Sequence, residues 1–176
     1  MAYLSDITIS IGCDPLLRIA IFRYFDTTMR ILGRNDRVDL PGLGLTNIHA
    51  KVDTGAYTCS LHCAYAKIID GELEFVLLDE EHPEFTGIKH RFKKFDQREI
   101  KNSFGEAELR FVIKTSIKIF DHRIKAEFSL SNRGNLKFPV LLGRKILRNR
   151  FLIDVTQKDL YFKSKNQPPH EVRANL

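Results

Sequence analysis

After residue 30 the chain alternates hydrophobic and polar residues with a two-residue period, which is the pattern of half-buried β-strands. The alternation runs through the segment 107–119 and resumes in 124–130, after a turn at 120–122. We predict that these two strands pair, because only a short turn joins them. Shorter runs rich in Val, Ile, Leu and Phe, each bounded by turn residues, predict further strands at 48–52, 67–69, 72–78 and 151–155.

In the part of the chain after the turn at 53–56, one segment shows a convincing helical pattern. It is 144–149, where two apolar residues can face inward. The chain is therefore predicted to be all-β, a small barrel or sandwich with one short C-terminal helix. We place this domain at 29–162. Residues 1–28 carry an apolar patch that does not follow the strand-and-turn pattern of the later chain, and they are predicted to be an N-terminal appendage. The polar residues 163–176 are predicted to be a flexible tail.

A carboxylate stands in the turn that follows the predicted strand 48–52. The turn is Asp53-Thr54-Gly55-Ala56. A glycine two residues after an acid permits positive φ or a close backbone approach, and the threonine hydroxyl between them can fix the turn from inside. Such a turn holds an aspartate in one position. Asp, Thr and Gly are also ordinary turn residues, so the rest of the sequence must decide what this turn does.

A second element bears on this turn. The apolar strand 138–142 runs into Gly143, and the predicted helix follows at once. Together, and in this order, Asp53-Thr54-Gly55-Ala56 and Leu141-Leu142-Gly143 resemble the retropepsin-like aspartic proteases, in which an apolar-apolar-Gly strand crosses beside the Asp-Thr-Gly loop and supports it. The resemblance implies that Asp53 is catalytic. It also implies a set of residues that form or support the active-site loop: Thr54, Gly55, Ala56, Leu141, Leu142 and Gly143.

The resemblance extends to one bacterial family of this class, often labelled ATP-dependent zinc protease, whose members occur beside or fused to the ribosomal-protein glutamate ligase. It covers residues 31–161. The matching segments are, in order, Leu32-Gly33-Arg34, Val38-Asp39-Leu40-Pro41, 50–56, Ser60-Leu61-His62, 100–105 and 139–144. The resemblance implies a retropepsin-like acid-protease barrel and, by family association, the processing of glutamate-extended protein tails, with a link to a ribosomal protein.

Peptide hydrolysis by carboxylates needs one group that takes a proton from water and another that supplies a proton. Two carboxyl groups a few ångströms apart share a single proton, because both cannot be charged at that distance. This chain offers one Asp-Thr-Gly, so we predict a homodimer to which each subunit contributes Asp53. Thr54 would then bridge to the opposite loop. Between two predicted strands lies a candidate flap over the cleft, formed by Asn102, Ser103, Phe104 and Gly105.

Two features depart from the retroviral pattern. Retropepsins usually carry an acid four residues after the catalytic aspartate, and it pairs with the arginine that follows the late glycine. Here that position is Tyr57, so either Arg144 has another partner or the dimer contact differs. The segment 79–97, with Pro83, Gly87 and a basic stretch, looks like an insertion that either shapes substrate choice or forms a long loop.

The overall charge favours acidic partners. Lys and Arg number 28 against 22 Asp and Glu, so the formal charge is +6 and the sequence pI is about 9.3. The basic residues form no long run. One segment, 91–95, interleaves them with aromatics, but its two phenylalanines would lie on opposite faces of a strand, so we do not expect nucleic-acid binding. Charge and family resemblance together favour an acidic peptide or protein substrate.

The sequence carries no strong cofactor motif. Cys59, His62 and Cys63 lie close together and His49 precedes the turn, but Cys-x-x-His-Cys is not a usual zinc spacing, so we expect no metal. The segment 42–44 lacks the third glycine of a dinucleotide fingerprint, and no Walker-type lysine motif gives support for ATP. No nucleophile elbow surrounds a serine or cysteine, which disfavours a serine or cysteine hydrolase.

Three cysteines without a preceding secretory signal favour a reducing, cytoplasmic setting. No apolar segment reaches the roughly 18 residues that a membrane span needs, so we expect no membrane partner. Two alternatives to a homodimeric aspartic endopeptidase stay open from the sequence. One is a non-catalytic retropepsin-like module for peptide binding or dimerisation, and the other is a zinc-dependent peptidase.

Overall fold

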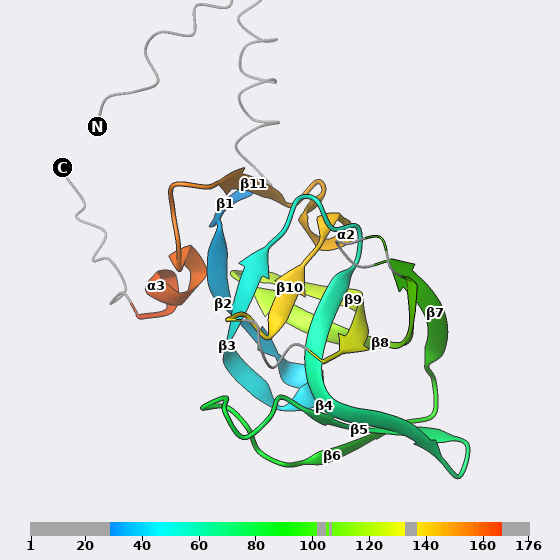
Figure 1. The fold of residues 1–176 in the computed structure, drawn as a ribbon. Helices are drawn as coiled ribbons and strands as arrows, with labels where there is room; N and C mark the ends of the chain where they lie inside the picture. Colours follow the sequence, from blue (N-terminus) through cyan, green and yellow to red (C-terminus); the bar gives the residue numbers. More distant parts are fainter. Residues whose placement is uncertain (1–28, 102–104, 106, 133–136, 167–176) are drawn as a thin grey trace, which may run out of the picture.

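The computed structural model describes residues 29–101, 105, 107–132 and 137–166 (Figure 1). The strands are β1 (Arg30–Gly33), β2 (Asn35–Leu40), β3 (Leu45–Val52), β4 (Cys59–Ile69), β5 (Glu72–Leu77), β6 (Lys89–Phe92), β7 (Asp96–Lys101), β8 (Ala107–Ile119), β9 (His122–Ser131), β10 (Val140–Leu142) and β11 (Phe151–Asp154). The helices are a 3-10 turn η1 (Pro41–Leu43), α2 (Arg144–Leu147) and α3 (Leu160–Asn166).

Six strands close into a barrel in the order β10-β3-β2-β8-β9-β4, with β4 pairing back to β10. Strands β5 and β6 extend the sheet beyond β4, and β7 pairs with β8. Strands β1 and β11 form a separate parallel pair at one end of the barrel (Figure 1). The predicted all-β acid-protease barrel is confirmed, and α2 is the predicted short helix.

Strand β10 completes the ring, although it comes late in the chain. On one side it pairs in parallel with β3, where Leu142 lies beside Val52. On the other side it pairs antiparallel with the start of β4, where Leu141 lies beside Ser60. The loop 53–58, which joins β3 to β4, therefore passes over the end of β10 (Figure 1).

Alternating apolar side chains build the core of the barrel. Along β2 every second residue is buried. Strands β8 and β9 pair antiparallel as predicted, and they place the fully buried Ile113 opposite the fully buried Phe128. Removing these side chains from water supplies the main favourable term for folding. The alternation that predicted the strands is thus the same alternation that fills the core.

Several strands were not predicted from the sequence. The first half of β4 was missed because its run from Cys59 to Cys63 contains the polar Ser60 and His62, yet all five residues are buried. Strand β6 was missed because it is short and carries three basic residues. The segment 79–97 is therefore not one long loop, since β6 pairs antiparallel with β5 and β7 begins at Asp96. Strands β1 and β2 were also missed.

The helix α3 was not predicted either, and its N-terminus is held by a residue far away in the sequence. The buried carboxylate of Asp36 on β2 accepts the backbone N–H of Tyr161 at 2.8 Å and of Phe162 at 3.0 Å. A carboxylate at this place satisfies N–H groups that have no partner inside the helix. The helix continues to Asn166, so residues 163–166 are not part of a tail.

Two predictions fall outside the described residues: the N-terminal appendage at 1–28, and residues 167–176 of the predicted tail. Within the described part of the chain, no helix has the length and apolar character needed to cross a membrane.

Candidate active site

The side chain of Asp53 is fixed by the turn in which it stands. Its backbone N–H donates to the carbonyl oxygen of Leu142 at 3.0 Å, which ties the residue to the end of β10. Its carboxylate oxygen Oδ1 accepts the N–H of Gly55 at 2.9 Å and of Ala56 at 3.1 Å. Asp53 is half-buried, and Gly55 is exposed. A Cβ on Gly55 would lie 3.2 Å from Oδ1, so a larger residue there would crowd the carboxylate.

The segment from β10 into α2 holds the loop through its main chain. The N–H of Arg144 donates to Ala56 O at 2.9 Å, and the N–H of Lys145 donates to Tyr57 O at 3.1 Å. At Gly143 a Cβ would lie 2.3 Å from Thr58 O, so this position has no room for a side chain. The structure thus brings Asp53, Gly55 and Ala56 together with Leu142 and Gly143, as the sequence predicts.

The remaining loop residues lie at the edges of this arrangement. Leu141 is half-buried on β10 between β3 and β4, where it supports the end of both strands. Thr54 is exposed, and its bridge to the loop of a second subunit stays a prediction.

Arg144 has a partner within its own chain. Its Nη1 donates to Thr54 O at 2.9 Å and to Gly55 O at 2.7 Å, and its guanidinium carbon lies 5.9 Å from the centre of the Tyr57 ring. The arginine therefore binds the carbonyl groups of the Asp-Thr-Gly loop in place of a carboxylate four residues after Asp53. This contact answers the question that Tyr57 raises in the sequence.

A cavity of about 240 Å³ opens next to the loop. It is lined by Tyr57 and Thr58 of the loop, by residues 98–100 of β7, and by Val112, Glu127, Ser129 and Lys145. The predicted flap connects β7 to β8, between Lys101 and Ala107. Of its residues, Asn102, Ser103 and Phe104 lie outside the described residues, and Gly105 is exposed with a φ of 84°. Strand β8, which was predicted, and strand β7, which was not, flank this segment, and its role as a flap stays a prediction.

Glu127 joins three elements around this cavity. It accepts Arg98 Nη1 of β7 at 2.9 Å and Lys145 Nζ of α2 at 2.9 Å, and Lys114 Nζ of β8 lies 3.6 Å away. The hydrogen bond from Arg98, followed by that from Lys145, lowers the pKa of Glu127 from its ordinary 4.5 to about 2. The carboxylate is therefore charged at any pH above the acidic range.

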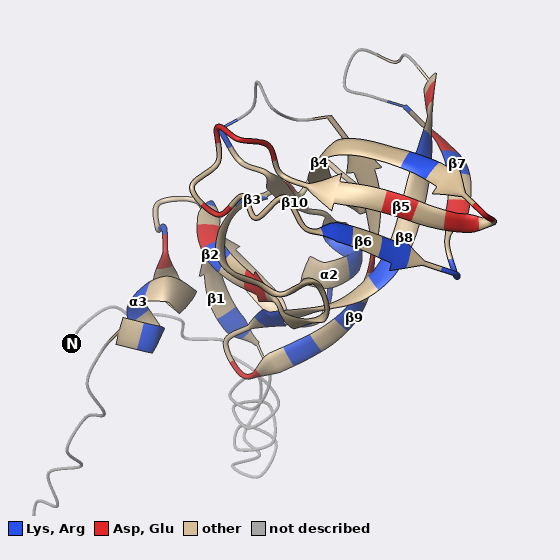
Figure 2. Cartoon of the chain, turned by 90° about the horizontal axis from the view of Figure 1, so that it is seen from below, with Lys and Arg blue, Asp and Glu red and all other residues tan. Residues whose placement is uncertain are grey.

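A larger cavity of about 780 Å³ adjoins this group. Among the residues that the structure describes, Glu127 is the one acid that lines it, and the lining cations are Lys114, Lys125, Lys145 and Arg150. Figure 2 shows Lys and Arg on β8 and β9 around α2. The sequence did not point to this group, because its members come from β8, β9, α2 and the loop after α2 and form no motif.

The cysteines considered for metal binding or nucleophilic chemistry are buried thiols. Burial raises the pKa of Cys59 and of Cys63 to about 11, so both remain protonated at neutral pH. Cys59 Sγ accepts the N–H of Gly143 at 3.3 Å, so this thiol has a structural contact at the end of β10. His49 is half-buried on β3 opposite Arg37. None of these three residues takes part in a cluster of potential metal ligands among the described residues.

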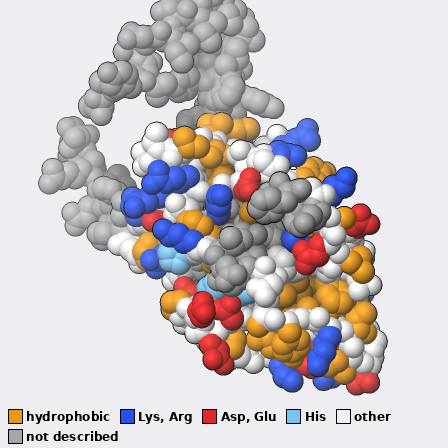
Figure 3. Space-filling view, in the orientation of Figure 1, with side chains coloured by type: hydrophobic (Ala, Val, Ile, Leu, Met, Phe, Trp, Pro, Cys, Tyr) orange, Lys and Arg blue, Asp and Glu red, His pale blue; other side chains and the backbone are white. Residues whose placement is uncertain are grey.

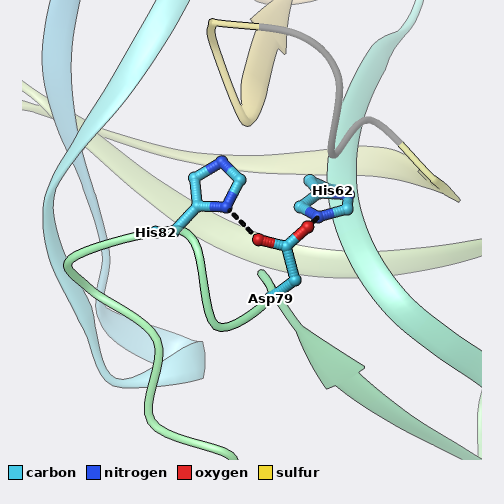
Figure 4. A group of neighbouring side chains, drawn as sticks. All are labelled: His62, Asp79 and His82. Carbon is cyan, nitrogen blue, oxygen red and sulfur yellow. Dashed lines mark hydrogen bonds and ion pairs between the residues drawn. The ribbon is translucent and has the colours of Figure 1, made fainter.

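The cluster found in the described residues is different. His62 lies with Asp79 and His82, two residues that the sequence did not single out (Figure 4). Hydrogen bonds from His82 and then from His62 lower the pKa of Asp79 below its ordinary value. The three residues meet only because the chain folds back after β5, so their spacing in the sequence does not predict the cluster.

Comparison with known proteins places the chain among retropepsin-like proteins. Residues 31–164 match the RimB-like family model, described as retropepsin-like aspartic endopeptidase RimB. Two curated relatives are each named probable alpha-L-glutamate ligase. The one from Desulfotalea psychrophila is 35% identical over 133 residues, which are 73% of this chain and 29% of the relative. The one from Shewanella halifaxensis is 34% identical over 131 residues, or 72% and 29%.

The chain thus spans less than a third of the length of these curated relatives. A solved structure with the same fold is a protein of unknown function from Legionella pneumophila, with a TM-score of 0.54 and 24% identity. The alignment covers 74% of this chain and 97% of that protein.

Proposed function

The chain belongs to the RimB-like family of retropepsin-like aspartic endopeptidases, and we propose from this that it hydrolyses peptide bonds as a homodimer with Asp53 of each subunit as the catalytic pair. The observation that carries the proposal is the fixed position of Asp53. Its carboxylate is held by two backbone N–H groups, in a loop that β10 and α2 bind through their main chains. A carboxylate fixed in this way can pair with a second one at little further cost in conformational entropy.

The single Asp-Thr-Gly of the chain requires the second carboxylate to come from a second copy. In the pair, one carboxyl group is charged and the other carries the shared proton. The charged group takes a proton from water while the water oxygen bonds to the carbonyl carbon, and the protonated group gives its proton to the carbonyl oxygen. The carboxyl group that took the proton from water then gives it to the leaving nitrogen as the C–N bond breaks. A hydroxyl of the tetrahedral intermediate passes its proton to the other carboxylate as the C=O bond of the new acid forms, so the dyad again holds one shared proton.

We propose an acidic, glutamate-extended protein tail as the substrate. Among the described residues, four cations line the larger cavity against one acid, and a +6 chain attracts acidic peptides. The curated relatives are named probable alpha-L-glutamate ligases, which supports a glutamate-rich substrate. By family association, a ribosomal protein is the first tail to test.

Replacing Asp53 tests the mechanism. Asp53→Asn keeps the acceptor oxygen for Gly55 and Ala56 but cannot act as the base, so cleavage of a glutamate-extended peptide should fall roughly 1,000-fold or more. The matched control is Asp70→Asn, because Asp70 stands in an exposed hairpin turn at positive φ, which asparagine tolerates. Both variants are compared with the wild type by product chromatography and by circular dichroism.

Three outcomes have different meanings. Unchanged cleavage by a folded Asp53→Asn protein would show that the aspartic mechanism is wrong. Binding of the peptide without cleavage by the wild type would favour the non-catalytic module. Equal cleavage of a glutamine-extended peptide with the same core sequence would remove the acidic substrate but leave the mechanism in place.

A further inference from the structure

Three potential metal ligands converge at the side of the barrel, outside the Asp53 loop. His62 Nε2 on β4 lies 2.7 Å from Asp79 Oδ2, and His82 Nδ1 lies 2.7 Å from Asp79 Oδ1. One donor atom from each of the three residues lies within 4.8 Å of the other two. Figure 4 shows both imidazole rings turned toward the carboxylate, which stands between them.

The backbone takes an unusual conformation to bring Asp79 to this place. Leu78, fully buried, has a φ of 61°, in the left-handed region that a leucine rarely occupies. Its N–H donates to His62 O at 3.2 Å, so the change of direction occurs directly beside His62. Strained residues of this kind concentrate where a site must be held in one geometry. Here the strain orients the residue that joins the two histidines.

The chain beyond Asp79 folds back so that His82 returns to the same point. The N–H of His82 donates to Asp79 O at 3.0 Å, and the N–H of Glu81 donates to Asp79 Oδ1 at 3.2 Å. These bonds form a tight turn whose first and last residues both contribute a ligand atom. His62 is fixed independently, because it lies within β4 with its side chain 1% exposed.

We propose that His62, Asp79 and His82 bind a divalent transition-metal ion, with zinc as the first candidate. Two imidazole nitrogens and a carboxylate oxygen form a donor set that suits zinc and its neighbours in the first transition row. Bonds of roughly 2.0 to 2.2 Å leave neighbouring ligand atoms of a tetrahedral ion roughly 3.3 Å apart. The present 2.7 Å contacts need to open by about half an ångström, and each histidine must present its unprotonated nitrogen, which its other tautomer provides.

The surroundings leave room for a further ligand and a path for the ion. The side chains of Asp79 and His82 are 28% and 12% exposed, so an ion can reach them from solvent. Figure 3 shows histidine side chains at this face of the molecule near acidic ones. Ser131, in register with His62 on the neighbouring β9, has a buried hydroxyl that no hydrogen bond reaches in the described part of the chain. Residues in register point to the same face of a sheet.

The ion would tie the turn at 79–82 to the barrel wall. It takes no part in the proposed hydrolysis, because its ligands are not those of the Asp53 loop. This site also differs from the Cys59, His62 and Cys63 set that the sequence brings to mind, in which both thiols are buried and protonated. A metal held here would stabilise the fold and leave peptide chemistry to the carboxylates.

Titration of the wild-type chain is the first test. The full chain is freed of metal with a chelator, exchanged into clean buffer and titrated with Co²⁺ and with Zn²⁺ by calorimetry. We expect one ion per chain, and Co²⁺ bands in the visible range without the strong near-ultraviolet bands of thiolate ligation. No binding, or thiolate bands, would overturn the proposal.

Variants locate the site. His82→Ala and His82→Gln should each weaken Zn²⁺ binding by more than roughly 100-fold, since loss of a direct ligand exceeds the 10- to 100-fold effect of residues that only support ligands. The glutamine variant keeps a group that can bond to Asp79, so it protects against the case in which the alanine variant does not fold. His122→Ala, on β9 outside the cluster, is the matched control.

Binding in folded His82 variants at wild-type affinity would show that the ion sits elsewhere. Zn²⁺ should also raise the melting temperature of the wild type and of Asp53→Asn alike, but not that of the His82 variants. Failure of the metal site would therefore leave the proposed aspartic mechanism untouched, and the reverse also holds.

Discussion

The partly buried carboxylate of Glu127 connects two elements beside the Asp53 loop through hydrogen bonds. It lies 17% exposed between Arg98 on β7 and Lys145 on α2, and both side chains donate to it at 2.9 Å. It thereby connects β7 to the helix whose backbone binds the Asp53 loop. Charged hydrogen bonds of this kind are stronger than neutral ones.

The stability of the fold should depend on the charge of Glu127. Its pKa in the folded chain is about 2, below its ordinary 4.5, so its ion pairs stabilise the fold above that ordinary value. The contribution is lost as the pH falls from about 4.5 toward 2. In urea unfolding, the free energy of unfolding of Glu127→Gln should lie below that of the wild type at pH 7. The gap should narrow below about pH 4.5 and close only toward pH 2.

Glu108→Gln is the matched control, since Glu108 is an exposed glutamate that pairs with Arg110 on β8. A gap between Glu127→Gln and the wild type that is equally wide at pH 7 and pH 3 would show that the carboxylate acts through its shape and not through its charge.

Individual residues at the site differ in whether the sequence could predict their positions. The Asp53 turn and the Gly143 position were predicted because each depends on local chemistry that a short motif records. The partner of Arg144 was not predicted, because it is a pair of backbone carbonyl groups and leaves no side-chain signature. His82 was not singled out from the sequence, since only the turn after β5 brings it to His62.

At the scale of elements, α3 depends on a cap that comes from the other end of the domain. Asp36 and Tyr161 are separated by 125 residues, and the carboxylate binds the first N–H groups of the helix. A helix of seven residues is too short to be stable on its own, so this long-range cap and the packing of Tyr161 decide whether it forms.

Asp36→Ala should lower the free energy of unfolding by about 2 kcal/mol, because two helix N–H groups lose their acceptor. Loss of helical signal by circular dichroism should accompany the loss of stability. Asp159→Asn, just before the helix, is the matched control, because asparagine tolerates the φ of 56° found there. Equal stability of the Asp36→Ala protein and the wild type would show that the cap is not needed.

The elements themselves were predictable where they bury one face. Strands β8 and β9 alternate apolar and polar residues, and both appear at nearly the predicted bounds. The start of β4 lies between β9 and β10 and is buried on both faces. The apolar–polar alternation used to predict strands assumes that one face is exposed to solvent, so the buried polar His62 did not fit it and this part of β4 was missed. The cap of α3 could not be seen, since sequence patterns record neighbours along the chain only.

At the scale of the whole molecule, the proposed activity belongs to a pair of chains. An equal mixture of wild type and Asp53→Asn, unfolded and refolded together, should place about one quarter of the dimers in the fully wild-type form. Cleavage per total protein should then fall to about a quarter of that of the wild type. An active monomer would give about one half. Mixing with Asp70→Asn in place of Asp53→Asn should leave the rate unchanged.

The position of β10 in the ring has a consequence for the order in which the protein forms. The contacts that hold the Asp53 loop join parts of the chain as far apart as Arg144 and Thr54, which are separated by 90 residues. Contacts of such long sequence separation form slowly, because a large loop must close first. A growing chain on the ribosome carries Asp53 long before β10 emerges, so the Asp53 loop can be fixed in place only after the segment through Arg144 has been made.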